Sequence, residues 1–486
     1  MLSVLSNHEP KNVLEFFEKI SRIPRGSHNE KAVSDYVVAF AKEKGFWVHQ
    51  DKALNVVIKK PGTAGFENAQ PVIIQAHLDM VCEKNAGTVH DFEKDPIKLV
   101  VEGDILRAEG TTLGADNGAG VAMALALLDS TNIPHPPLEV LLTTGEEVGL
   151  LGAAKVDGGL FEGRVLLNLD SGEEGFFCVS CAGGARVDLS YPLEYHDLPA
   201  TYSAKVLKIR GLKGGHSGID ITKERGNSNR LLGRALRILR SKFAVQFADI
   251  NGGSKENAIP RESEVVIAFA ESAGGELADE VRRIEKTFKH EYAASDEGLE
   301  LYLEDCQGDV NKMFSQSLCD KIVTALLLLP NGVQAMSLVF PDLPETSLNI
   351  GVVTTGADAV VIASGARSSV GSRRGMLLEQ VNAVAEMTGA SVGVSGLYPA
   401  WEYDKDSGLR EKAMRIFAQM FGRDARIRGT HGGLECGIFR ERIPGVDIIS
   451  FGPDIHEMHT PNETMSVSSF GRTWDFLVKL VAELAG

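Results

Sequence analysis

The sequence predicts an α/β protein: a first domain with a mixed sheet flanked by helices, interrupted by an inserted α+β domain. Three observations predict this fold. The chain has 486 residues, which is too long for a single hydrophobic core. Short apolar strands alternate with helical segments in the first third, as in sheets covered by helices. From about residue 187, alternating polar and apolar residues and long amphipathic helices indicate a second architecture.

The first domain is expected to contain a helix near its start. Ser27 and Glu30 have the spacing of a capping box, apolar residues then recur with helical periodicity, and Gly45 ends the helix. A second helical stretch is expected at 118–128. Four short apolar strands are expected at 56–58, 72–74, 138–143 and 165–169.

The inserted domain is expected at 187–396. Amphipathic helices are predicted at 230–243 and 276–292, and a hairpin with its turn at 356–358. We assign 1–186 and 397–486 to the first domain, because a histidine that its site requires lies in the C-terminal segment.

Composition and charge exclude some classes of function. The net charge of −16 argues against a nucleic-acid-binding protein, because phosphate binding needs a basic face. No signal peptide or membrane-spanning segment is predicted, since the longest uncharged apolar run, around 118–128, is too short. Six cysteines are few, and the single C-x-x-C at Cys178 and Cys181 has no second pair. We therefore expect free thiols and a cytoplasmic location.

The stretch "PVIIQAHLDMV" places two polar residues at the end of an apolar strand. Residues i and i+2 of a strand face the same side, so His77 and Asp79 are expected to leave the carboxyl end of the sheet together. Open α/β sheets have their sites at that end. A buried His–Asp hydrogen bond without a metal is the alternative interpretation.

Further acidic residues follow other predicted strands. Asp116 lies among glycines just before a helix, Glu146 and Glu147 follow one strand, and Asp170 follows another. The strand alternation predicts that Glu146 and Glu147 face opposite ways and have different roles. Clustered carboxylates repel one another unless a cation lies between them. Nitrogen and oxygen ligands together suit Zn²⁺, and also Mn²⁺ or Co²⁺.

Two metal ions are expected rather than one. One histidine and one aspartate cannot complete a tetrahedral site, and the carboxylates are too many for a single ion. Two ions can share a bridging carboxylate and a bridging water. The second ion needs another histidine, and "FGPDIHEMHTPNE" offers both His456 and His459.

At this point the sequence resembles a known family. It is similar to the co-catalytic zinc peptidases that include carnosinase-type dipeptidases, aminoacylases and bacterial carboxypeptidase G, and the resemblance spans essentially the whole chain. The similar stretches include "QAHLDMV", "VHDFEKDPI", "GTTLGADNGAG", "PLEVLLTTGEEVG", "NLDSGEEG", "CAGG", "GLKGGHSG", "NAIPRE", "ETSLNIGVV", "HGGLECG" and "HTPNE".

The resemblance implies a set of metal ligands. His77 and Asp170 would hold one ion, Glu147 and His459 the other, and Asp116 would bridge both. His459 is preferred to the other histidine because it begins the family pattern H-[ST]-P-x-E.

The resemblance also implies catalytic and substrate-binding residues. Glu146 would act as general base and then acid, and Asp79 would orient the histidine ligand. The inserted domain would supply His216 to the developing oxyanion, Asn257 to the substrate and Arg367 to the free carboxylate of a peptide. Without the resemblance, His216 and Arg367 would be interpreted as solvated surface residues. The loop at Gly432 and Gly433 is expected to hold the substrate termini.

The implied activity is metal-dependent hydrolysis of dipeptides, with Xaa-His dipeptides preferred, by a protein that is commonly a homodimer through the inserted lid domain. A related amidohydrolase (a tripeptidase, aminoacylase or desuccinylase) would share the metal residues. A non-catalytic binding protein would have lost the base or a ligand, and this chain has both.

Overall fold

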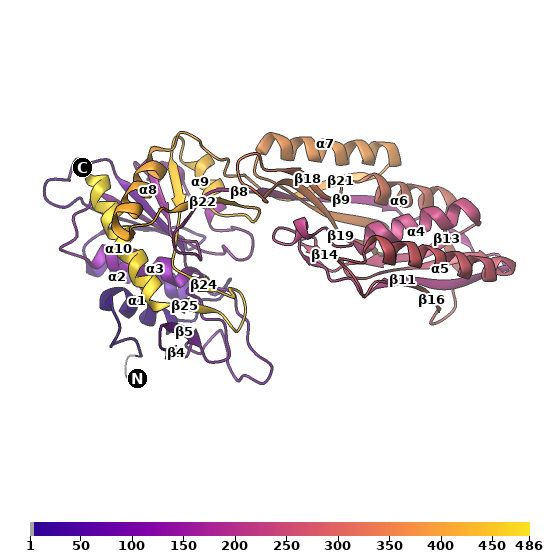
Figure 1. The fold of residues 1–486 in the computed structure, drawn as a ribbon, viewed down its shortest axis with the longest axis horizontal. Coiled ribbons are helices and arrows are strands. Elements are labelled where there is room, and N and C mark those ends of the chain that lie inside the picture. Colours follow the sequence, from indigo (N-terminus) through magenta and orange to yellow (C-terminus); the bar gives the residue numbers. More distant parts are fainter. Residues whose placement is uncertain (1–3) are drawn as a thin grey trace. The chain divides into compact units, whose positions relative to one another are not determined.

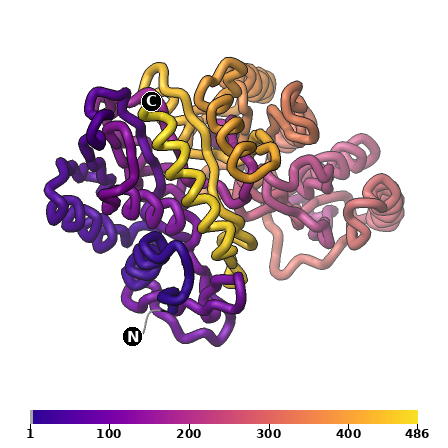
Figure 2. The backbone as a smooth tube through the Cα atoms, turned by 60° about the vertical axis from the view of Figure 1, so that its left-hand side comes forward, coloured from indigo at the N-terminus to yellow at the C-terminus, as the bar shows by residue number. Residues whose placement is uncertain are grey.

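The computed structural model describes residues 4–486 and divides into two compact units. The first contains the described residues up to Cys181 together with Tyr403–Gly429 and Leu434–Gly486. The second contains Ala182–Glu402 and Thr430–Gly433. In Figure 2 the yellow C-terminal segment lies in the unit that also contains the indigo N-terminal segment.

The first unit contains a mixed sheet of eight strands, in the order β1-β2-β6-β3-β7-β23-β8-β22. Its central strands β6, β3, β7 and β23 are mutually parallel, whereas β1 pairs antiparallel with β2, β2 with β6 and β8 with β23. The bounds are β1 Trp47–Gln50, β2 Val56–Lys60, β3 Val72–His77, β6 Leu138–Thr143, β7 Val165–Asn168, β8 Phe176–Cys181, β22 Arg426–Thr430 and β23 Asp447–Ser450.

The predicted mixed α/β architecture is confirmed, and it determines where the site lies. Every residue of β3 and β6 is buried, as expected for parallel strands covered on both faces. Because β3 is parallel to both β6 and β7, the carboxyl ends of these three strands meet at one edge of the sheet. Figure 1 labels the helices of this unit: α1 Lys11–Ser21, α2 Lys31–Glu43, α3 Ala115–Asp129, α8 Gly408–Phe421, α9 Cys436–Arg442 and α10 Val467–Ala485.

A small antiparallel sheet completes the first unit, in the order β24-β25-β5-β4. Through β25, the C-terminal segment pairs with β5. The bounds are β4 Leu99–Glu102, β5 Ile105–Ala108, β24 Ile455–His456 and β25 Thr464–Ser466.

The capping box predicted for Ser27 and Glu30 is wrong. Helix α2 begins at Lys31, and its N-cap residue Glu30 makes no side-chain capping bond. Glu30 instead accepts the backbone N–H of Gly145 at 3.1 Å, and Ser27 donates to Asp79 at 2.8 Å. Tertiary partners have therefore replaced the local ones that the sequence pattern indicates.

The second unit is built on an antiparallel sheet, in the order β16-β11-β15-β13-β19-β20-β9-β21, with β18 also paired to β19. The strands are β9 Gly183–Pro192, β11 Tyr202–Arg210, β13 Gln246–Gly252, β15 Ser263–Ala270, β16 Glu300–Asp305, β18 Gly332–Met336, β19 Pro344–Thr355, β20 Ala359–Ser368 and β21 Ser391–Tyr398. Two short pairs accompany it: β10 Tyr195–Asp197 with β17 Lys312–Phe314, and β12 Gly215–His216 with β14 Ala258–Ile259.

Four helices pack on this sheet and bury a large apolar cluster: α4 Ser228–Lys242, α5 Gly274–Glu291, α6 Gln316–Leu328 and α7 Gly371–Thr388. Helices α4 and α5 lie within two residues of the predicted bounds. The predicted hairpin is β19–β20, and Gly356 N donates to the carbonyl of Ala359 at 2.8 Å across its turn.

Two further properties concern the whole described chain. The six cysteines are all free, and Cys178 and Cys181 are buried. Within residues 4–486, the helices are too short or too polar for any of them to traverse a bilayer.

Candidate metal centre

The candidate centre lies where β3, β6 and β7 end. His77 is the last residue of β3, and Asp170 follows β7 by two residues. Glu146 and Glu147 lie in the turn that follows β6. Two segments from elsewhere in the chain supply the rest of the cluster: the first turn of α3 carries Asp116, and the loop between β24 and β25 carries His459.

The carboxylate of Asp116 lies between two imidazoles. Its Oδ1 is 3.0 Å from Nε2 of His77, and its Oδ2 is 3.1 Å from Nε2 of His459. His77 Nε2 is also 3.5 Å from Asp170 Oδ1, and His459 Nε2 is 3.2 Å from Glu147 Oε2. The structure therefore brings all five predicted ligands together, in two groups that share Asp116.

The sequence offered two histidines, His456 and His459, as ligands of the second metal ion. The structure places them in different surroundings. His456 is exposed on β24, where it pairs in register with Thr464. Of the two, only His459 lies in a group of residues whose ligand atoms are all within 4.8 Å of one another, the group formed with Asp116 and Glu147.

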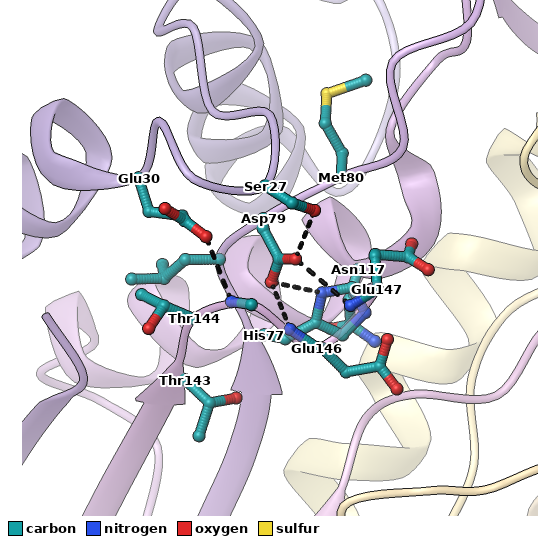
Figure 3. A network of polar contacts seen from close by, with 12 residues as sticks. Ser27, Glu30, His77, Asp79, Met80, Asn117, Thr143, Thr144, Glu146 and Glu147 are labelled. Carbon is teal, nitrogen blue, oxygen red and sulfur yellow. Dashed lines mark hydrogen bonds and ion pairs between the residues drawn. The ribbon is translucent and has the colours of Figure 1, made fainter. Parts of the chain in front are cut away.

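Asp79 is fully buried and lies between Ser27 and His77 (Figure 3). Its Oδ1 is 3.4 Å from His77 Nδ1, on the side of the ring opposite Asp116. It also accepts the backbone N–H of Glu146 at 3.1 Å and of Glu147 at 3.2 Å. Burial alone would raise the pKa of Asp79, but His77 and these hydrogen bonds lower that pKa to about 2. An ionised Asp79 thus contacts both the histidine and the turn that carries the two glutamates.

The sequence predicted, from strand alternation, that the side chains of Glu146 and Glu147 face opposite ways, and this argument is wrong. Strand β6 ends at Thr143, so strand alternation does not apply to residues 146 and 147. Their side chains nevertheless have different surroundings. Glu147 contacts His459, whereas Glu146 forms no ion pair with any described residue and belongs to a group with His77 and Glu147. The turn, fixed by Asp79, sets this difference.

The electrostatics of the cluster are those of a cation site. Burial raises the pKa of Glu146, and Asp170 and Glu147 raise it further. Burial also raises the pKa of Glu147, and hydrogen bonds to Asp116 and Glu147 raise the pKa of His459 to about 11. Raised pKa values of this kind follow when several carboxylates are buried close to one another, and a divalent cation relieves the repulsion between them.

The residues present fit a two-metal centre. Within residues 4–486, three groups of His, Asp and Glu have their ligand atoms within 4.8 Å of one another, and two of these groups have Asp116 in common. Glu147 Oε1 is buried and lacks a hydrogen-bond partner, so it can still accept a ligand bond. Mixed nitrogen and carboxylate donors with a shared carboxylate are appropriate for two ions of the Zn²⁺ type.

Sequence reasoning missed three residues that hold the cluster in place. Glu463 is buried and accepts four consecutive backbone N–H groups, from Leu113 at 2.8 Å to Asp116 at 3.3 Å. Arg25 is buried and donates to the carbonyls of Leu78 and Asp79, both at 2.9 Å, and to that of Gly114.

The third missed residue is Asn117, whose Nδ2 donates to Asp170 Oδ1 at 2.7 Å. The only signal for Glu463 was its place in the pattern that begins at His459. No local pattern indicated Arg25 or Asn117.

In the second unit, the predicted substrate-binding residues lie near one another. Residue His216 pairs with Ala258 between β12 and β14, and the next N–H, that of Ser217, donates to the carbonyl of Asn257 at 2.8 Å. Nδ1 of His216 accepts from the backbone of Gly218 at 3.2 Å and from the next residue at 3.3 Å. The ring proton is therefore on Nε2, which makes this atom a hydrogen-bond donor.

Arg367 lies on β20 and donates to Tyr398 Oη at 3.3 Å and to the carbonyl of His431 at 3.5 Å. Burial, together with the nearby Arg367 and His216, lowers the pKa of His431 to about 3. Gly432 and Gly433 directly follow His431, and a Cβ on Gly433 would lie 2.7 Å from the Tyr398 ring. These positions therefore form one cluster within the second unit.

The fold and the cluster together define the class: a hydrolase with a His/carboxylate metal centre. Comparison with known proteins agrees. The model of Peptidase family M20/M25/M40 matches residues 73–483. The Escherichia coli K12 protein named cytosol non-specific dipeptidase is 39% identical over 483 residues, covering 99% of each chain.

Solved structures give the same result. The aminoacylhistidine dipeptidase of Vibrio alginolyticus superposes with a TM-score of 0.89 at 39% identity, over 99% of this chain and 98% of the other. An aminopeptidase of Bacillus cereus has a TM-score of 0.56 at 16% identity, over 99% and 100% of the two chains, which is a similarity of fold alone. The chain belongs to peptidase family M20/M25/M40 and is a metallopeptidase.

Proposed function

We propose that this metallopeptidase hydrolyses dipeptides, with Xaa-His dipeptides such as β-Ala-His among its preferred substrates. The full-length similarity to a cytosol non-specific dipeptidase and to an aminoacylhistidine dipeptidase supports this substrate class. The observation that carries the mechanism is the position of Asp116, whose two carboxylate oxygens face the Nε2 atoms of His77 and His459.

We assign five residues to two divalent ions, Zn²⁺ in preference to Mn²⁺ or Co²⁺. His77 and Asp170 would hold one ion, Glu147 and His459 would hold the other, and Asp116 would be shared between them. When bound, two such ions polarise the scissile carbonyl and lower the pKa of a shared water. The distances of 3.0 to 3.5 Å among these side-chain atoms support this division of the ligands.

Glu146 is the proposed general base. It takes a proton from the attacking water and later delivers that proton to the leaving amine. Its carboxylate lies within 4.8 Å of ligand atoms of His77 and Glu147, so it borders the proposed metal site. Asp79 fixes the orientation of His77 and the turn at Glu146, and so supports both functions.

The second unit would bind the substrate. His216, a donor at Nε2, would stabilise the oxyanion, and Arg367 would pair with the free carboxylate of the dipeptide. Asn257 and the loop at Gly432 and Gly433 would complete the contacts. The cluster that these residues form around His431 supports a common role.

A tripeptidase, an aminoacylase or a desuccinylase would use the same metal residues. Peptidase T of Escherichia coli matches 68 residues, 13% of this chain, and thus supports the family rather than its substrate. The dipeptidase is favoured because the similarity to the cytosol non-specific dipeptidase and to the aminoacylhistidine dipeptidase spans the whole chain, including the second unit.

The test is hydrolysis of β-Ala-His by protein stripped with a chelator and then supplied with Zn²⁺, Mn²⁺ or Co²⁺. We expect activity to disappear on stripping and to return with metal. Hydrolysis of Gly-His, Gly-Leu, tripeptides and N-acyl amino acids is measured under the same conditions. If acyl amino acids are hydrolysed faster than every dipeptide, the dipeptidase assignment is wrong.

We also propose a cytoplasmic homodimer that forms through the second unit. The word "cytosol" in the name of the Escherichia coli relative supports the location. The two edges of the large sheet support the dimer because they differ in charge. Edge strand β16 exposes Glu300, Glu304 and Asp305, which discourage pairing with another strand.

Edge strand β21 instead has no charged residue and is exposed along seven of its eight positions. Val394 on this strand is 50% exposed and Leu397 is 61% exposed. A long, uncharged edge with exposed apolar side chains is a template for pairing. Antiparallel pairing with the same strand of a second copy satisfies a two-fold axis, and it brings no like charges together in a chain with a net charge of −16.

A further inference from the structure

A fully buried polar network lies directly beneath the candidate metal centre. The three central strands each contribute one polar side chain to it: Gln75 from β3, Thr143 from β6 and Asn168 from β7. Asn168 Nδ2 donates to Gln75 Oε1, and Gln75 Nε2 donates to Thr143 Oγ1 at 3.2 Å. Burying polar groups is costly, and apolar residues of the same shape would hold the strands together at less cost.

Glu435 joins two of these strands. Its Oε2 accepts from Gln75 Nε2 at 2.6 Å and from Thr143 Oγ1 at 2.7 Å. Its other oxygen is buried without a hydrogen-bond partner. Glu435 precedes helix α9 but makes no side-chain capping bond to it, so capping does not explain the residue.

The residues that Glu435 holds are those from which the cluster emerges. Gln75 lies two residues before His77 on the same strand, so both side chains are on the same face. Thr143 ends β6 and pairs in register with His77. The bonds to Glu435 therefore fix the spacing between the ends of β3 and β6 at the level of the metal ligands.

The charge of Glu435 is consistent with this position. No cation forms an ion pair with it among the described residues, and burial raises its pKa to about 8. A neutral carboxyl group supplies a hydrogen-bond acceptor without adding another negative charge close to Asp79 and Asp170.

We infer that Glu435 is a positioning residue for the metal centre: it acts through Gln75 and Thr143 to hold His77 and the Glu146–Glu147 turn at the spacing that two metal ions require. This inference rests on the proposed metal site. Residues that orient ligands in this way commonly contribute 10- to 100-fold, in order of magnitude, to metal affinity or activity.

The test compares Glu435→Ala, Glu435→Gln and Thr143→Val with the parent. Zn²⁺ affinity is measured by competition with a chromophoric chelator, and kcat and KM are measured separately. We expect Glu435→Ala to weaken Zn²⁺ binding and to lower kcat, each about 10-fold or more, with little change in KM. Glu435→Gln keeps an acceptor oxygen and should retain both properties. Thr143→Val, which preserves shape, should change them in the same direction as Glu435→Ala.

The matched control is Glu139→Ala. Glu139 is also buried in β6, but at its opposite end, where it accepts from Gly163 N at 2.9 Å and pairs with Lys59 at 2.8 Å. Its loss should lower the melting temperature without weakening Zn²⁺ binding.

If Glu435→Ala binds two Zn²⁺ ions as tightly as the parent and only melts earlier, the inference is wrong. It is also wrong if Glu435→Gln loses as much as Glu435→Ala. A parent that binds no metal would instead contradict the proposed function.

Discussion

The carboxylate of Glu463 accepts the backbone N–H of Asp116, although the two residues are 347 positions apart. The same carboxylate accepts the three preceding N–H groups, so both of its oxygens are in use. Asp116 is the residue between the two imidazoles, and its backbone is therefore held by a residue four positions after His459. The geometry of the segment around Asp116 therefore depends on the segment from His459 to Glu463.

Replacing Glu463 by Gln should loosen the metal centre. The new amide group would direct its N–H bonds at backbone donors, leaving two of them unpaired in a buried place. We expect Zn²⁺ affinity to fall about 10-fold, measured by chelator competition. Glu441→Gln, at an exposed position of α9, is the control and should bind as the parent does. Unchanged affinity in Glu463→Gln would mean that Asp116 does not depend on this bond.

Replacing Glu146 by Gln should separate metal binding from chemistry. The amide cannot accept the water proton, so kcat should fall about 10²- to 10⁴-fold. The bound metal, measured by elemental analysis after gel filtration, should remain at the parental stoichiometry. Glu147→Gln is the contrast, because it removes a proposed ligand and should lower the metal content. If the kcat of Glu146→Gln stays within a few-fold of the parental value, Glu146 is not the general base.

The loss of folding stability at acidic pH should depend on the protonation of Glu174. The residue is 8% exposed, and its carboxylate pairs with Arg472 at 2.6 Å and with Arg423 at 2.7 Å. Burial opposes ionisation, but the two arginines lower its pKa below the unfolded value of about 4.3. A lowered folded pKa contributes stability above the unfolded pKa, and that contribution is lost as pH falls through the folded pKa.

Glu174→Gln should therefore be less stable than the parent at pH 7, and the difference should shrink below about pH 4.3. Urea unfolding of both proteins in chelator, at pH 7 and pH 3.5, measures this without a contribution from metal binding. A difference that stays constant over this range would show that the ionised form of Glu174 is not what stabilises the fold.

Local signals in the sequence predicted the strands and the acidic and histidine residues near their ends, whereas the resemblance to the zinc peptidases implied which five residues are ligands. Apolar runs mark the strands, and polar residues at their ends mark the edge where His77 and Asp170 meet. The supporting residues were missed because their partners are far away in the chain. Ser27 and Glu30 had the pattern of a capping box, yet each bonds to a residue 52 or more positions away. A local pattern contains no information about such partners.

Replacing His216 by Ala tests the proposed oxyanion contact. Two backbone N–H groups fix its ring so that Nε2 is a donor. A donor that acts on the developing charge affects kcat, and its loss should lower kcat about 10²- to 10³-fold with a smaller rise in KM. His290→Ala, at an exposed position of α5, should leave both constants unchanged. An effect of His216→Ala confined to KM would assign this histidine to ground-state binding.

The proposed dimer depends on the exposed edge of β21, and Val394→Lys should disrupt it. In an antiparallel pair of identical strands, the two new lysines would approach each other across the two-fold axis, where like charges repel. We expect dimer dissociation to become at least about 10-fold more favourable, measured by sedimentation equilibrium, which corresponds to roughly 1.4 kcal/mol. Leu338→Lys adds the same charge at a residue of the second unit that is 90% exposed and lies outside β21, and this variant should dimerise as the parent does. Equal dissociation of the two variants would show that the second copy binds elsewhere, because the added charge alone would then account for the change.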